Sequence, residues 1–317
     1  MHNTCLACLF AVSASAFEHA IAICDGRDAR ALAGATYAAS MHELKTEIEQ
    51  FACAKDPGRS PRVREVFLQF RAALTEGKIR AAERSGRGWV VNSWVKQGIL
   101  LGFQLGELSE TGDRAGLSFV DKDTFPPRQW RVEERVRVVP GGSSVRLGAY
   151  VAPSVICMPP MFINVGAYVD EGAMVDSHAL VGSCAQIGKR VHLSAAAQIG
   201  GVLEPVNARP VIIEDDVLIG GNSGVYEGTL VRAGAVLGAG TILTRGTAVH
   251  DLVRGQVYRA TAQTPLEIPE NAVVVPGARG VTKGKAAEWN LSLYTPVIVK
   301  YRDEKTAGGV ELEDLLR

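Results

Sequence analysis

Three charged side chains have the chemistry needed to hold and activate an amine beside a carboxylate. Asp176 and Glu227 each come shortly after an aliphatic residue of a regular repeat, so both should point away from its interior. A carboxylate there can hold an amino group and help to remove its proton. Arg137 could bind a carboxylate, because a guanidinium donates hydrogen bonds in a planar fork. From residue type alone, each could equally be a solvated surface charge or a subunit contact.

Asp176 and Glu227 lie in a repeat of six residues. Every sixth residue is apolar, and the frame resumes after one interruption: Val145, Val151, Cys157, Ile163, Val169, Val175, Val181, Ile187, Leu193, Ile199, and then Ile213, Ile219, Val225, Val231, Leu237, Leu243 and Val249. This period fits neither a helix nor a single strand, but it fits a short strand plus a turn, repeated around a prism. The sequence therefore predicts a mainly β chain built on a parallel β-helix, with three hexads per coil and about 4.8 Å between coils.

Two further features of the repeat concern its corners. Glycine often follows the apolar residue by three positions, where a corner would need positive φ: Gly148, Gly166, Gly172, Gly228, Gly234, Gly240 and Gly246. Between Ile199 and Ile213 the step is fourteen residues instead of six, so eight residues must leave the coil near 201–210. A loop that leaves a rigid scaffold is a common place for a binding element, although a tolerated surface insertion would look the same.

The chain divides into four predicted segments. Residues 1–40 are predicted to be a dispensable extension, because Met41 opens a more protein-like segment and no Lys or Arg precedes the apolar start, as a secretory signal would require. The others are a helical N-terminal domain over 41–135, the β-helix over 136–255 with its external loop near 201–210, and a C-terminal β/α cap over 256–317.

Smaller elements follow from local patterns. Helices are expected over 44–51, 63–74, 78–83 and 311–317, a strand running into an apolar helix over 89–103, a loop-rich connection over 104–135, a cover for the last coil over 268–281, and a strand over 291–300.

The composition excludes several classes of function. Lys+Arg and Asp+Glu both total 34, so the net charge is zero and no nucleic-acid partner is expected. No run reaches the roughly 18 apolar residues that span a bilayer, so no membrane association is expected. Cys157 and Cys184 are expected to act as small apolar residues, and the single CxxC at Cys5 and Cys8 is a weak metal signal. We expect unpaired thiols in a reducing compartment, which indicates the cytoplasm.

Several segments carry a specific resemblance. They are VGAYVDEGAMVDSHALVGSCAQIGKRVHLS (165–194), IGGVLEP (199–205), IIEDDVLIGGNS (212–223), GWVVNSWVKQGILLGF (88–103), RVVP (137–140) and VIVK (297–300). Together they resemble the 2,3,4,5-tetrahydropyridine-2,6-dicarboxylate N-succinyltransferases, a family of the hexapeptide-repeat acyltransferase superfamily. The resemblance runs from about Met41 to Arg317 and leaves residues 1–40 outside.

This resemblance implies a left-handed β-helix and a homotrimer with active sites between neighbouring prisms. It also implies transfer of a succinyl group from succinyl-CoA, as a co-substrate, to the amine of ring-opened tetrahydrodipicolinate in lysine and diaminopimelate biosynthesis. No permanently bound cofactor is implied. The enzyme would have to bind a dicarboxylate, accept a proton from the amine and stabilise a tetrahedral oxyanion.

The resemblance also assigns roles to residues. The substrate-binding aspartate of the family falls on Asp176, and its substrate-binding arginine falls on Arg137. The family has a glutamate where this chain has Gly224, so Glu227 is our candidate for a substitute general base. Small residues in the later coils would allow a pantetheine arm to approach closely, and these candidate CoA contacts are Gly221, Asn222, Ala239 and Gly240.

Three rival interpretations remain open. The first is an acetyl-CoA-dependent acyltransferase on the same scaffold, acting on the same or a related substrate. The second is a non-enzymatic trimeric scaffold. The third is a metalloenzyme like the β-helix carbonic anhydrases, with His178 and His192 as ligands and His250 far along the axis. A zinc site needs three or four convergent ligands, so no metal is expected.

Overall fold

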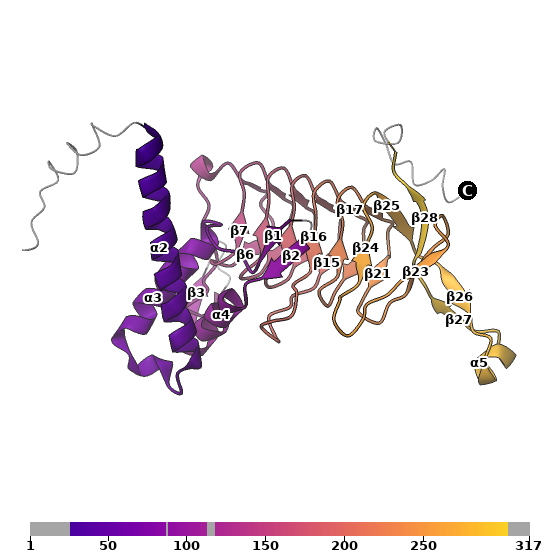
Figure 1. Cartoon of the computed structure of the whole chain (residues 1–317), viewed down its shortest axis with the longest axis horizontal. Coiled ribbons are helices and arrows are strands. Elements are labelled where there is room, and N and C mark those ends of the chain that lie inside the picture. Colours follow the sequence, from indigo (N-terminus) through magenta and orange to yellow (C-terminus); the bar gives the residue numbers. More distant parts are fainter. Residues whose placement is uncertain (1–25, 87, 113–117, 304–317) are drawn as a thin grey trace, which may run out of the picture. The chain divides into compact units, whose positions relative to one another are not determined.

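The computed structural model describes residues 26–86, 88–112 and 118–303 (Figure 1). The chain forms two compact units, 1–47 and 48–317. Helix α2 (Gly26–Cys53) starts in the first unit and ends in the second, so the predicted boundary between residues 40 and 41 falls inside a helix. Most of the predicted extension and the predicted helix over 311–317 lie outside the described residues. No described helix is both long and apolar enough to cross a membrane.

The second unit contains the predicted parallel β-helix, whose stacked coils are visible in Figure 1. Its three faces are sheets A, B and C, which the chain visits in that order from β5 to β21. Sheet A contains β5 (Arg137–Val138), β8 (Ile156–Cys157), β11 (Met174–Val175), β14 (His192–Leu193), β17 (Leu218–Ile219), β20 (Val236–Leu237) and β25 (Ala272–Val275). Sheet B contains β6 (Ser144–Val145), β9 (Phe162–Ile163), β12 (Leu180–Val181), β15 (Gln198–Ile199), β18 (Gly224–Val225) and β21 (Ile242–Leu243). Sheet C contains β7 (Tyr150–Val151), β10 (Tyr168–Val169), β13 (Gln186–Ile187), β16 (Ile212–Ile213), β19 (Leu230–Val231) and β24 (Glu267–Ile268).

The register confirms three hexads per coil. Val151 pairs with Val169, 18 residues on, as three hexads require. Ile187 pairs with Ile213, 26 residues on, so eight extra residues leave the coil between β15 and β16 as predicted. The predicted interior residues are all buried, none more than 2% exposed. The apolar repeat therefore forms one continuous core along the axis.

The corners confirm most of the glycine prediction. Six of the seven glycines have φ between 70° and 90°, but Gly246 does not adopt positive φ, so that assignment was wrong. The turn holding Gly246 closes differently, because Thr247 Oγ1 accepts the backbone N–H of Thr244 at 2.9 Å. Non-glycine residues take the same left-handed corner elsewhere, among them His178 and Asn222.

Helices and two hairpins precede the prism. They are η1 (Pro57–Arg59), α3 (Pro61–Thr75), β1 (Ala82–Ser85), β2 (Gly88–Val91), α4 (Ser93–Leu105), β3 (Leu108–Gly112), β4 (Ser118–Lys122) and η2 (Val132–Glu134). The strand that runs into an apolar helix is confirmed as β2 and α4. The helix expected over 78–83 was wrong: Ala82–Ser85 pairs antiparallel with Gly88–Val91, and Ala82 packs with Ile212 and Leu230 of sheet C.

The C-terminal segment first adds strands to the prism and then covers its end. Strands β24 and β25 pair in parallel with β19 and β20, so 267–275 add a coil instead of only capping one. The other elements are β22 (Val249–Asp251), β23 (Gln256–Tyr258), β26 (Ala278–Gly280), α5 (Gly284–Glu288), β27 (Ser292–Tyr294) and β28 (Val297–Tyr301). Strand β28 runs antiparallel to β25 and covers the edge of sheet A. The β26–β27 hairpin projects from this end with α5 at its tip (Figure 1).

Candidate functional site

Asp176 lies at the edge between sheets A and B, the AB edge, directly after β11. Its Oδ1 accepts the backbone N–H of Ser177 at 2.7 Å, which fixes the carboxylate in the turn. Its Oδ2 accepts no hydrogen bond from the described residues, and the side chain is 29% exposed. One carboxylate oxygen is therefore held in place while the other remains available to a ligand.

His192 stands beside this carboxylate from the next coil. Its Cα pairs with that of Met174 on the outer face of sheet A, and its Nε2 lies 3.9 Å from Asp176 Oδ2. That nitrogen has no hydrogen-bond partner within the described residues and is shielded from solvent. Because 3.9 Å is too long for a hydrogen bond, a small movement is needed to close this pair. Sequence analysis considered His192 only as a possible metal ligand.

Arg137 shares the outer face of sheet A with Asp176. Strand β5 pairs with β8, and β8 pairs with β11, so Arg137 is level with Met174, two residues before Asp176. Two strand spacings separate them, about 10 Å along the prism. The Arg137 side chain is exposed and forms no ion pair within the described part of the chain. A free carboxylate oxygen and a free guanidinium thus face the same side.

The four candidate CoA residues continue along the AB edge. Gly221 and Asn222 follow β17, and Ala239 and Gly240 follow β20. The backbone N–H of Asn222 is donated to Ala195 O at 3.0 Å, and that of Gly240 to Gly221 O at 2.9 Å. The N–H groups of Gly221 and Ala239 find no acceptor among the described residues. The edge therefore presents two free backbone donors to anything that lies along it.

Glu227 lies on the other side of sheet B, at the BC edge, after β18. Its Oε2 accepts the backbone N–H of Arg245 at 2.7 Å from the following coil. Asp176 and Glu227 therefore occupy opposite edges of sheet B, and one chain does not bring them together. Arg137, Asp176 and the candidate CoA residues share one surface, whereas Glu227 belongs to another.

A cavity of about 820 Å³ adjoins Glu227. Its walls are the extruded loop 200–209, Trp89 of β2, Tyr226, Arg245 and the segment 262–265. The loop that the sequence marked as a possible binding element therefore lines this cavity. Both carboxylates and guanidiniums line it, so the cavity has no strong excess of either charge.

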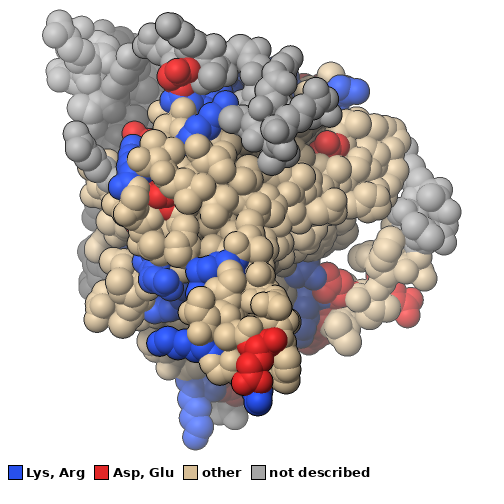
Figure 2. All heavy atoms as spheres, turned by 90° about the vertical axis from the view of Figure 1, so that its right-hand side faces the viewer, with Lys and Arg blue, Asp and Glu red and all other residues tan. Residues whose placement is uncertain are grey.

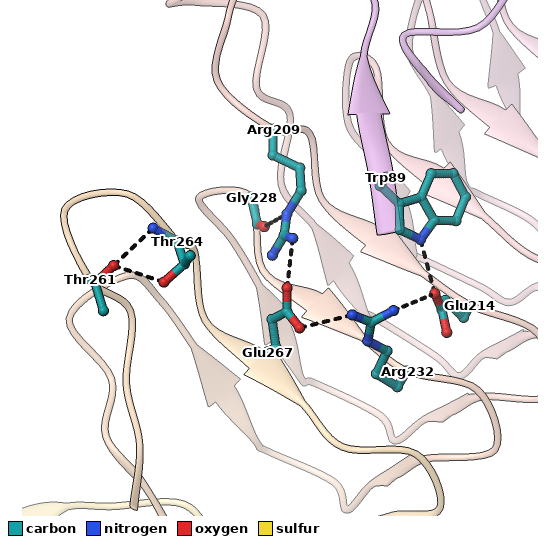
Figure 3. Close-up of polar contacts among 8 residues, drawn as sticks. All are labelled: Trp89, Arg209, Glu214, Gly228, Arg232, Thr261, Thr264 and Glu267. Atoms are coloured by element: carbon teal, nitrogen blue, oxygen red, sulfur yellow. Dashed lines mark hydrogen bonds and ion pairs between the residues drawn. The ribbon is translucent and has the colours of Figure 1, made fainter. Parts of the chain in front are cut away.

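A chain of alternating charges holds these walls together (Figure 3). Trp89 Nε1 donates to Glu214 at 2.9 Å, Arg232 pairs with both Glu214 and Glu267, and Arg209 pairs with Glu267 at 2.9 Å. Burial would raise the pKa of Glu267, but hydrogen bonds from Arg209 and Arg232 outweigh it and hold the pKa below its usual value. The hairpin, the loop and the last coil are thus connected through side chains that six-residue periodicity does not identify.

Lys96 fixes the loop from the other side. It is fully buried in α4, and its Nζ donates to the carbonyl oxygen of Ala208 at 2.7 Å. Burial lowers the pKa of Lys96. The pattern of α4 predicted an apolar helix, and nothing in the local sequence showed that its lysine points inward to a loop 112 residues away.

Gly224 is explained by the side chain two residues on. A methyl group at Gly224 would lie 2.4 Å from Tyr226 Cε2, and the same ring lies against Gly200. The Tyr226 ring therefore occupies the outer face of sheet B where a side chain of residue 224 would stand. A glutamate at position 224 is incompatible with this arrangement.

The two buried thiols of the prism are poor nucleophiles. Burial raises the pKa of Cys157 and of Cys184 to about 12 each, which keeps both thiols protonated and poorly nucleophilic. Neither is paired in a disulfide. Within the described ranges, no group of three His, Cys, Asp or Glu side chains could hold a metal ion.

Comparison with known proteins points to one family for two separate parts of the chain. The family model for the tetrahydrodipicolinate N-succinyltransferase N-terminal domain matches residues 43–105, and that for the hexapeptide repeat of succinyl-transferase matches 210–245. The chain is similar to three curated 2,3,4,5-tetrahydropyridine-2,6-dicarboxylate N-succinyltransferases. That of Nitrobacter winogradskyi is 43% identical over 82% of this chain and 92% of the relative. Those of Sodalis glossinidius and Acinetobacter baylyi are 41% and 40% identical, over 86% and 87% of this chain and 96% and 99% of the relatives.

Proposed function

The chain belongs to the 2,3,4,5-tetrahydropyridine-2,6-dicarboxylate N-succinyltransferase family, and on that premise we propose that it moves a succinyl group from succinyl-CoA to the amine of ring-opened tetrahydrodipicolinate. This acyl transfer is a step of lysine and diaminopimelate biosynthesis. One observation supports the proposal most strongly: a free carboxylate oxygen on Asp176 and an unpaired guanidinium on Arg137 face the same side of sheet A.

These two groups match the two kinds of charge on the acceptor. Asp176 Oδ2 accepts hydrogen bonds from the substrate amine, and Arg137 donates to a substrate carboxylate. The fixed Oδ1 keeps the carboxylate from turning away when the amine binds. The imidazole of His192, from the next coil, stands beside Asp176 and limits where the amine can approach.

The donor lies along the AB edge in this proposal. The free N–H groups of Gly221 and Ala239 donate to carbonyl oxygens of the pantetheine arm, and the absence of bulky side chains there permits close approach. Asn222 and Gly240 form the left-handed corners that shape this path. Succinyl-CoA binds as a co-substrate and leaves as CoA.

In the reaction, the amine nitrogen attacks the thioester carbon, a C–N bond forms and the C–S bond breaks. The ammonium first loses one proton to a carboxylate, for which we propose Glu227. The second proton leaves the nitrogen after attack and reaches the departing sulfur. The two buried thiols remain protonated, which favours direct transfer over an acyl-cysteine intermediate.

The placement of Glu227 requires a second chain. Asp176 and Glu227 occupy opposite edges of sheet B, so a complete site needs the AB edge of one subunit to meet the BC edge of its neighbour. We therefore propose a homotrimer with three such sites, since a cyclic assembly repeats one contact between unlike surfaces. The unpaired thiols are consistent with a reducing compartment, and we propose that the enzyme works in the cytoplasm.

Thiol release tests the proposed activity. Wild-type enzyme with tetrahydrodipicolinate should release CoA from succinyl-CoA faster than from acetyl-CoA. Asp176→Asn should lower kcat/KM at least about tenfold, because the amide no longer provides a charged acceptor. Asp170→Asn is the matched control, since Asp170 also caps a turn by accepting the N–H of Glu171 at 2.8 Å. No release from either donor, or a preference for acetyl-CoA, would contradict the proposal.

A further inference from the structure

Tyr226 follows β18 at the BC edge, next to Glu227, and its ring lies against sheet B. A methyl group at Gly200 would lie 2.7 Å from Tyr226 Cδ1, and one at Gly224 would lie 2.8 Å from the Tyr226 hydroxyl oxygen. Gly200 directly follows β15, and Gly224 is the first residue of β18. Two neighbouring positions without side chains thus form a slot that holds the ring in one place.

The coils of the prism do not require an aromatic residue at this position. The residues that directly follow the strands of sheet B are Arg146, Asn164, Gly182, Gly200, Tyr226 and Thr244. Most of them are small or polar, and the coils that contain them close with the same register. The tyrosine and the slot that holds its ring therefore need an explanation other than the fold.

The hydroxyl of Tyr226 is available to a ligand. It forms no hydrogen bond with the described residues, and it is not one of their buried polar atoms that lack a partner, so it stays open to solvent. Tyr226 lines the cavity of about 820 Å³ together with Glu227. A phenol donates and accepts hydrogen bonds through the same oxygen atom. The ring is therefore fixed while its polar end remains unused.

Few other groups around this cavity can exchange a proton. Its charged lining side chains are Glu204, Arg209, Glu227 and Arg245. A guanidinium does not lose its proton in proteins, and Glu204 is exposed on the extruded loop. Acidic side chains are also sparse on the surface seen from the C-terminal end of the prism, where uncharged residues cover most of the area (Figure 2). Beside Glu227, the described lining thus offers Tyr226 as a proton-exchanging group held by packing.

The proposed reaction leaves one proton without a carrier. Glu227 takes the first proton from the ammonium, so its carboxyl is already protonated when the nitrogen attacks the thioester. The nitrogen must then lose a second proton, and the departing sulfur must gain one. A group that gives one proton and accepts another at the same oxygen atom meets both needs.

We propose that the Tyr226 hydroxyl is this proton carrier, a catalytic group on the same edge as Glu227. As the C–S bond breaks and its electron pair moves to sulfur, the phenol gives its proton to the sulfur and CoA leaves as the thiol. The phenol oxygen then takes one proton from the positively charged nitrogen, which becomes the amide N–H, and the hydroxyl is restored. No further reactant is consumed. This inference rests on the proposed function.

Tyr226→Phe tests the assignment, because it removes the hydroxyl and keeps the ring in its slot. With succinyl-CoA and tetrahydrodipicolinate, we expect kcat for CoA release to fall about a hundredfold. Both KM values should stay within about twofold of wild type, and the thermal midpoint should not change. Tyr150→Phe is the matched control and should leave kcat unchanged, since the Tyr150 ring stacks on Tyr168 at 4.5 Å on the outer face of sheet C.

A second measurement separates proton transfer from a packing role. Replacement of Tyr226 by 3-fluorotyrosine and by 3,5-difluorotyrosine makes the phenol more acidic in steps and changes its size little. The carrier must hold its proton before the transfer, so the basic limb of the kcat–pH profile should move to lower pH with each fluorine. A purely structural role of the ring would leave this limb where wild type has it.

The outcomes separate this inference from the proposed function. If wild type is active and Tyr226→Phe has the same kcat, the assignment is overturned and the proposed activity stands. A basic limb that fluorination does not move overturns it in the same way, even where Tyr226→Phe lowers kcat together with the thermal midpoint. If wild type releases no CoA from succinyl-CoA, the proposed function fails, and the role of Tyr226 fails with it.

Discussion

At the scale of single residues, the six-residue frame separates inward from outward side chains. It correctly indicated that Asp176 and Glu227 face away from the core, because the residues that precede them on the strands are buried. It could not indicate the neighbours of an outward side chain, which come from adjacent coils. The proximity of His192 to Asp176 depends on the pairing of Met174 with His192, 18 residues apart.

The departure at Gly224 shows a second limit of sequence reasoning. Because the family has a glutamate where this chain has Gly224, sequence reasoning offered Glu227 as a substitute general base. The structure adds a steric cause, because the ring of Tyr226 covers Gly224 and Gly200. A side chain at position 224 would have to displace the Tyr226 ring.

We predict that Gly224→Glu destabilises the chain by about 1–3 kcal/mol, because the new side chain must displace a well-packed ring. The same substitution in a Tyr226→Ala background should cost clearly less, since the space is then open. Urea unfolding of the four chains in this cycle measures the coupling. Equal costs in both backgrounds would show that the ring does not set the requirement for glycine.

At the scale of elements, the sequence predicted the position of the extruded loop but not the side-chain contacts that hold it. The fourteen-residue step located the loop and its eight extra residues. The loop is attached to Lys96 through Ala208 and to Glu267 through Arg209. These contacts join segments up to 112 residues apart, and no local pattern contains them. The hairpin over 82–91 was missed for a similar reason, because Ala82 and Trp89 are positioned by packing against sheet C.

The link through Glu267 should weaken in acid. A carboxyl whose folded pKa lies below its unfolded value stabilises the fold above the unfolded pKa, about 4.3, and this contribution is lost as the pH falls through the folded value. Glu267→Gln removes the charge at every pH. We therefore predict that wild type exceeds this variant in thermal midpoint above about pH 5, and that the difference shrinks below about pH 4.

Glu288→Gln provides the control for that comparison. Glu288 lies at the hairpin tip and pairs with Lys285, and both side chains are more than 60% exposed. An exposed pair contributes little to stability, so the thermal midpoint of Glu288→Gln should equal that of wild type at each pH. A constant difference between wild type and Glu267→Gln from pH 7 to pH 3 would refute the proposed role of the Glu267 carboxylate.

At the scale of the whole molecule, the regular coils of the prism determine where each outward side chain lies. The sequence predicted the fold class, the coil length and the core, because all three follow from one period. It did not predict that 267–275 rejoin the prism after an excursion, since only two short strands carry that pairing. The prism places Asp176 and Glu227 on opposite edges, and this separation leads to the central claim that each active site needs two subunits.

Subunit mixing tests that claim most directly. Asp176→Asn and Glu227→Gln should each be nearly inactive alone, but chains of the two variants refolded together should regain activity. Random assembly into cyclic trimers leaves about a quarter of the sites with both native carboxylates, so about a quarter of wild-type activity is expected. Each chain keeps the carboxylate that the other lacks, on the edge that meets its neighbour. Mass spectrometry of the mixed samples checks that the subunits have exchanged. If they have exchanged and the samples remain as inactive as the single variants, the site is not shared between chains.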